Sequence, residues 1–181
     1  YCCIHLTRPS TLIPDRKKMG IACHKESAKG AYIIKDYCEK SPRKGIVVIR
    51  GTAPISSLMQ VLPSIKNDGP NVKIIAAVSI ELFKNQSKEY QDLIISPTDW
   101  NDAMIITNTS LKNMNNWIKN QQVVKYSLSP DFDNRWRTGG SVDQIIKESK
   151  LDPLSILNAI NIFSDNREKR LNILKEQIPD H

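Results

Sequence analysis

The chain has 181 residues, 40% of them hydrophobic and 25% charged, and a formal net charge of +7 at pH 7. A chain of about 150 residues buries roughly 70% of its unfolded surface, so we expect one globular domain with a short extension. No apolar run approaches the roughly 20 residues that a bilayer-spanning helix needs, so we expect no membrane association.

Basic residues are scattered along the chain, at 16–18, 40–44 and 167–170, and alternate with acidic ones. Nucleic-acid interfaces combine clustered basic residues with stacking aromatics, and no such combination occurs here. We therefore interpret the positive charge as a solvated surface that can attract phosphorylated substrates, and expect no nucleic-acid partner.

The four cysteines, Cys2, Cys3, Cys23 and Cys38, have no CxxC spacing and no nearby pair of histidines. This excludes the common zinc-site patterns, and we predict no metal site in the chain. Buried thiols in a reducing cytoplasm are the expected state.

The N-terminal stretch Tyr1–Leu6 is apolar and strand-like, and Pro9 ends it. It has neither an initiator methionine nor a basic n-region, so we expect no signal peptide and a start inside a longer protein. Residues 10–28 have little apolar periodicity and are predicted to be a linker. We therefore assign the first strand to a preceding domain.

A strand followed by a helix forms the centre of the predicted domain. Ile46–Ile49 is an apolar, β-branched run, typical of a parallel strand covered on both faces. The apolar positions of 55–65 recur at steps of three and four, which predicts an amphipathic helix. Thr52 is expected to cap this helix with its side chain. Gly51 lacks the GxGxxG context, so we interpret this turn as packing the helix on the sheet rather than binding a nucleotide.

Four other segments are predicted to complete the sheet. Residues 31–37 precede the central strand by too few residues for a crossover helix, so they form an antiparallel or edge strand. Residues 72–78 and 103–107 are parallel-type strands, and 123–128 is the last, less covered one. We therefore predict an α/β fold: a three-layer, doubly wound, mostly parallel five-stranded sheet with one antiparallel edge strand.

A polar and aromatic loop occupies residues 129–140. Ser141 and Gln144 then make a capping box for a short helix, and a final helix begins at Asp152 and exposes residues 167–170.

This loop contains the densest group of candidate site residues, Asp133, Arg135, Trp136 and Arg137. It follows a predicted strand at the end where open α/β sheets bind ligands. Arginine, tryptophan and paired carboxylates also make interfaces, and we favour an interface over an anion-binding pocket.

Arg8 is the other candidate, because a guanidinium at the exposed end of a strand can bind a phosphate with two hydrogen bonds. The histidines have no neighbouring serine, cysteine or acid in a catalytic pattern, and no pair of residues forms a convincing acid–base couple. We assign no catalytic residue.

The order of segments resembles the C-terminal part of a transketolase. The words that match lie along nearly the whole chain; they are Leu6-Thr7-Arg8-Pro9, Lys29-Gly30-Ala31-Tyr32, Val48-Ile49-Arg50-Gly51-Thr52, Val72–Val78, Ser79-Ile80-Glu81-Leu82-Phe83 and Phe132-Asp133-Asn134-Arg135-Trp136-Arg137-Thr138-Gly139-Gly140. The later words are most similar to a long branch related to homodimeric 2-oxoacid dehydrogenases.

The resemblance implies a division of the chain. Residues 1–13 would be the tail of a pyrimidine-binding domain, 14–29 a linker and 30–181 the transketolase C-terminal domain, which serves dimer assembly and structural support. Arg8 matches the arginine of the family's Leu-Ser-Arg-Gln word, which binds the substrate phosphate. In this chain the word is Leu-Thr-Arg-Pro, and proline replaces the glutamine.

The family's activity, a transferase of the pentose phosphate pathway, is then implied for the intact polypeptide only. Transketolases move a two-carbon ketol unit between sugar phosphates as cytoplasmic homodimers, using thiamine diphosphate and a divalent metal, magnesium or calcium. The residues that hold these groups would lie upstream of Tyr1, so we expect this fragment alone to be inactive and to bind no cofactor. A related 2-oxoacid dehydrogenase or deoxyxylulose phosphate synthase, or a non-catalytic regulatory or anion-binding module, are the alternatives.

Overall fold

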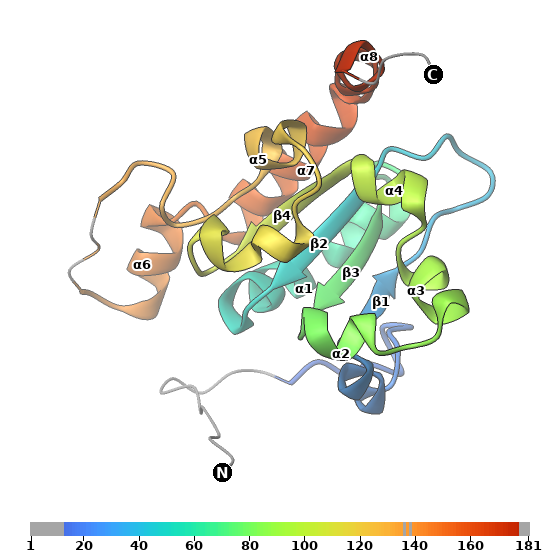
Figure 1. The fold of residues 1–181 in the computed structure, drawn as a ribbon. Coiled ribbons are helices and arrows are strands. Elements are labelled where there is room, and N and C mark those ends of the chain that lie inside the picture. The colour runs from blue at the N-terminus through green and yellow to red at the C-terminus, as the bar shows by residue number, and fades with distance from the viewer. Residues whose placement is uncertain (1–12, 136, 138, 178–181) are drawn as a thin grey trace.

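A computed structural model describes residues 13–135, 137 and 139–177 of the chain. Its centre is a sheet of β1 (Ala31–Lys35), β2 (Ile46–Arg50), β3 (Lys73–Ala77) and β4 (Ala103–Thr107), in the order β1-β3-β2-β4. β2 pairs in parallel with β3 and β4, and β1 pairs antiparallel with β3 (Figure 1). The predicted α/β class and the antiparallel edge strand are therefore confirmed.

One face of the sheet is covered by α1 (Thr52–Asn67) and α7 (Pro153–Asp165). The apolar stripe predicted for α1 packs inward, and Leu58, Leu62 and Ile65 are at most 1% exposed. They join Val47 and Ile49 of β2 in one core cluster. Burying a leucine or isoleucine side chain contributes about 1.5–3 kcal/mol, so this cluster is a major source of stability.

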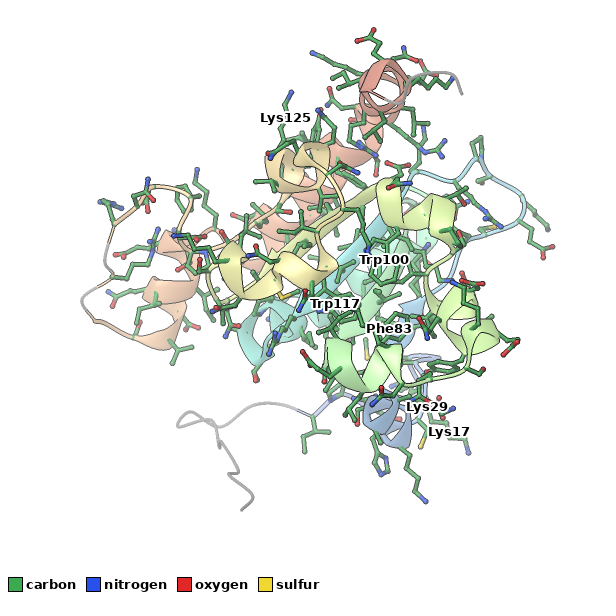
Figure 2. The ribbon with its side chains drawn as sticks, in the orientation of Figure 1. Lys17, Lys29, Phe83, Trp100, Trp117 and Lys125 are labelled. Carbon is green, nitrogen blue, oxygen red and sulfur yellow. The ribbon has the colours of Figure 1, made fainter. Side chains whose placement is uncertain are left out.

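The opposite face is covered by short elements: α2 (Ile80–Lys84), α3 (Lys88–Ile94), α4 (Pro97–Asn101), η2 (Leu111–Trp117) and α5 (Gln121–Tyr126). Within this layer Trp117 stacks on Phe83 and Trp100, with ring centroids 5.7 and 6.0 Å away, and the three rings lie together in Figure 2. The domain thus has the predicted three layers, helices on both sides of a sheet (Figure 1).

The predicted fifth strand is wrong. Residues 121–126 form α5 instead, because Asn120 caps the helix by accepting hydrogen bonds from the backbone of Gln122 and Val123. Val123 is fully buried in the core on the α5 side. After α5, Leu128 forms an isolated parallel bridge with Ile106, and no strand follows it in this part of the described chain. The described sheet therefore has four strands.

The C-terminal part also differs from the prediction. The capping box of Ser141 and Gln144 is confirmed at the start of α6 (Val142–Glu148). The single final helix is wrong, since α7 ends at Asp165 and α8 (Arg167–Gln177) follows. Arg170, expected on the surface, is 1% exposed and pairs with Asp102.

The segment before β1 contains a short 3-10 helix, η1 (His24–Lys29). Arg16 connects the residues that precede η1 to β1. It donates hydrogen bonds to the carbonyl of Ala22 and to the hydroxyl of Tyr32 at 3.1 and 3.0 Å. Cys23 and Cys38 are free and exposed, so the expectation of buried thiols is wrong for these two. No helix in the described ranges has the length and apolar character to cross a membrane.

Candidate functional site: the carboxyl edge of the sheet

The connections that leave the carboxyl ends of the parallel strands go to opposite faces. After β2 the chain enters α1 on one face, whereas after β3 and β4 it enters α2 and η2 on the other. Open α/β sheets bind ligands where neighbouring strands diverge in this way. Two such points lie here, one between β2 and β3 and one between β2 and β4.

Gly51 makes the sharp exit from β2 into α1. Its φ of 105° suits glycine, and a Cβ atom there would clash with Oδ1 of Asn108. The predicted cap is wrong: Thr52 is the first residue of α1, and Gly51 before it provides no side-chain cap. The amides of Thr52 and Ala53, in the first turn, therefore have no acceptor within the helix.

An open cleft of about 1060 Å³ lies where β2 and β3 diverge; we call it the β2–β3 cleft. Residues 50–52 and 77–78 form its end at the sheet, and the segment 13–19 lies across from α1. Its charged lining residues are Arg16, Lys18 and Arg50 against Asp15. The cleft is thus predominantly basic.

A second cleft, of about 600 Å³, lies between the 129–140 loop, α6 and the start of α1. Its apolar wall includes Ile145 and Ile146 of α6, and its polar wall includes Asp131, Arg135 and Arg137.

The structure brings together Asp133, Arg135 and Arg137 of the predicted site. Asp133 accepts from Nε of Arg135 at 2.9 Å and from Nη2 of Arg137 at 3.1 Å. Desolvation raises the pKa of Asp133, but the hydrogen bonds from the two arginines outweigh it and lower the pKa to about 2.

Arg137 also donates to backbone carbonyls on both sides of the loop. Its guanidinium reaches the oxygens of Pro130 and Arg135 at 2.6 and 3.2 Å, and that of Glu148 at 3.1 Å. The side chain is only 10% exposed, whereas that of Arg135 is 72% exposed. Arg137 therefore holds the loop together, and Arg135 is the arginine available to another molecule.

Asp131 connects the same loop to the segment that follows β4. Its carboxylate accepts from Ser129 and, at 2.7 Å, from Ser110 at the start of η2. Desolvation raises the pKa of Asp131, but these hydrogen bonds dominate and lower it.

Two of the predicted site residues, Arg8 and Trp136, lie outside the described residues. Sequence reasoning missed the β2–β3 cleft, although one signal was present. Thr52, Ser56 and Gln60 recur every four residues, which places three polar side chains on one line of α1. Within the described ranges no group of three or more His, Cys, Asp or Glu side chains is placed to hold a metal ion.

No family model matches the chain. It is similar to two transketolases of Craterostigma plantagineum: transketolase 10, 25% identical over 92 residues, and a chloroplastic transketolase, 31% identical over 96 residues. These matches cover 49% and 50% of this chain, but 13% and 18% of the relatives. The chain therefore spans less than a fifth of their length.

Solved transketolases share the fold. The enzyme from Leishmania mexicana aligns over 79% of this chain and 19% of its own, with a TM-score of 0.60 and 10% identity. The enzyme from Pichia stipitis, in complex with sedoheptulose 7-phosphate, aligns over 84% of this chain and 19% of its own, with a TM-score of 0.54 and 15% identity. The chain is thus similar in sequence to transketolases over about half of its length and shares their fold over most of it, which is consistent with a transketolase C-terminal domain.

Proposed function

We propose that this chain is the C-terminal region of a transketolase whose intact polypeptide transfers a two-carbon ketol unit between sugar phosphates, as in the pentose phosphate pathway. The observation that supports this most strongly is the agreement of two comparisons, one by sequence and one by fold, on the same family. Residues 1–13 are assigned to the pyrimidine-binding domain, 14–29 to a linker and 30–181 to a domain for dimer assembly and structural support.

The chemistry is assigned to the part of the enzyme upstream of this chain. Thiamine diphosphate, held there with a magnesium or calcium ion, supplies the electron sink for the transfer. The described residues contain no cluster of His, Cys, Asp or Glu suited to the metal and do not fit that role. Because the family resemblance assigns the cofactor-binding residues to that upstream part, we propose that the 181-residue chain by itself is inactive and binds no thiamine diphosphate.

For the 129–140 loop we propose a role in the dimer or domain interface. The exposed side chain of Arg135 and the ring of Phe132, 47% exposed, support it, because arginine and aromatic residues are enriched at interfaces. Nζ of Lys150 lies 4.4 Å from the centroid of the Phe132 ring, which adds a cationic rim.

Arg8 is proposed to bind the phosphate of the sugar substrate. In the intact enzyme, Arg8→Ala should raise KM for phosphorylated substrates far more than for unphosphorylated ones. Equal increases for both would remove the phosphate role.

A cytoplasmic location is also part of the proposal. The free, exposed thiols of Cys23 and Cys38 fit a reducing compartment. One of the similar transketolases is named chloroplastic, so fractionation of cells that express the intact protein is the deciding measurement.

The test of the main proposal compares the intact polypeptide with a version that ends before Gly30. Sedimentation should show a dimer for the intact polypeptide and a weaker or absent dimer for the shortened one. Ketol transfer from a ketose phosphate to an aldose phosphate should require the intact form. Activity toward 2-oxoacids, or synthesis of deoxyxylulose phosphate, would instead favour a related thiamine enzyme.

A further inference from the structure

We propose that the β2–β3 cleft binds a small organic oxyanion, a phosphate ester or carboxylate with an apolar tail. The cleft lies where β2 and β3 send their connections to opposite faces of the sheet. This is the position that open α/β folds use for ligands. Its volume, about 1060 Å³, can hold a ligand of metabolite size.

The charge of the lining selects an anion. Arg16, Lys18 and Arg50 outnumber Asp15, the one acidic residue among the described lining residues. The carboxylate of Asp15 is partly occupied within its own turn, because it accepts a hydrogen bond from the backbone amide of Lys18 at 3.0 Å. The cleft between the loop and α6 differs, because Asp131 lines it and both of its arginines are paired with Asp133.

Arg50 is the residue that we assign to the oxyanion. It is half-buried at the end of β2, and within the described ranges it makes no ion pair with a carboxylate. Its polar contact is a long one, 3.8 Å from Nη1 to the sulfur of Met114. Glu81 of α2 accepts instead from Ser79 at 2.9 Å. A guanidinium whose polar contact is a weak one with a thioether gains from an oxyanion, which accepts two hydrogen bonds in the plane.

The side of α1 that lines the cleft is suited to bind the rest of the ligand. Thr52, Ser56 and Gln60 form a polar line along the helix, and Ile55 and Met59 lie beside it as an apolar line. Thr52, whose amide has no acceptor within α1, lies at the end of this surface next to Arg50. A ligand with its oxyanion at that end and its apolar tail along Ile55 and Met59 contacts both the polar and the apolar line of α1.

Phenyl phosphate is the probe for this site, titrated into the 181-residue chain at constant ionic strength. We expect saturable changes in the ¹H–¹⁵N signals of Thr52, Ala53 and Val78. Inorganic phosphate should compete with it, and phenol should leave these three signals unchanged. Arg50→Gln should weaken binding about tenfold or more, because a charge-assisted hydrogen-bond pair is lost.

Arg43→Gln is the matched control, since it removes an arginine from the loop before β2, where Arg43 stacks 4.7 Å from the centroid of the Tyr37 ring. It should change the dissociation constant less than twofold. A second variant, Ser56→Asp, places a carboxylate in the cleft and leaves Arg50 unchanged. It should also weaken the binding of phenyl phosphate.

Three results would overturn the proposal. The signal changes could spread over the whole basic surface, or Arg50→Gln and Arg43→Gln could weaken the binding of phenyl phosphate equally. The third is that phenol binds as tightly as phenyl phosphate. Absence of binding would overturn it as well. None of these results bears on the transketolase assignment, because ketol transfer and dimer formation test that assignment independently.

Discussion

Arg170 and Asp102 form an ion pair inside the protein, with 2.7 Å between Nη2 and Oδ1, although 68 residues separate them. Arg170 is 1% exposed and Asp102 5%. The guanidinium stacks 3.6 Å from the centroid of Phe163 and donates to the carbonyl of Lys44 at 3.3 Å. This pair joins α8 to the start of β4.

We expect Asp102→Asn to lower the free energy of unfolding by about 3–5 kcal/mol, because it leaves the Arg170 guanidinium buried without a counter-charge. Urea denaturation followed by circular dichroism measures the loss. Lys169→Ala, an exposed change on the same helix, is the control and should stay within about 0.5 kcal/mol of the parent. Similar effects of the two variants would show that α8 is not fastened by the pair.

Gly51→Ala is expected to destabilise the domain by about 1–3 kcal/mol from backbone strain alone, because φ is 105°. The contact of the new methyl group with Asn108 adds to this. Adding Asn108→Gly to Gly51→Ala should restore only the share of the stability that was lost through this contact. Gly139→Ala, where φ is 149° and a Cβ meets no atom within 4 Å, should cost less than Gly51→Ala in thermal denaturation.

The low pKa of Asp133 predicts how the 129–140 loop responds to acid. The folded pKa of about 2 lies below the usual value near 3.9, so its stabilising effect is complete above about pH 4 and disappears as pH falls toward 2. An NMR titration of the Asp133 carboxyl carbon should show a midpoint near 2. In the double variant Arg135→Gln and Arg137→Gln the midpoint should rise toward 4; an unchanged midpoint would show that the two arginines do not lower this pKa.

Val124 distinguishes α5 from the strand that the sequence predicted. Its side chain is 38% exposed, so replacement by alanine removes little packing and should stabilise a helix by up to about 0.5 kcal/mol. In a strand the same change would destabilise. The neighbouring Val123→Ala, at a fully buried position, should cost about 1–3 kcal/mol in urea denaturation.

The local features of the chain were predictable from sequence. The spacing of Leu58, Leu62 and Ile65 defines one face of a helix, and Ser141 with Gln144 defines a helix start, because both depend on residues a few positions apart. The α/β class followed from the alternation of such segments. The loop residues Asp133 and Arg137 were recognised for the same reason, since four positions separate them.

Contacts between distant residues were decided by the tertiary structure. The run Val123–Leu128 suits a strand or a helix, and burial of Val123 against one face of the sheet selects the helix. Arg170 is buried because Asp102, 68 residues away, supplies the opposite charge. The β2–β3 cleft exists because α1 and α2 leave neighbouring strands toward opposite faces. Strand order and long-range pairing depend on the packing of the whole chain, which no local pattern contains.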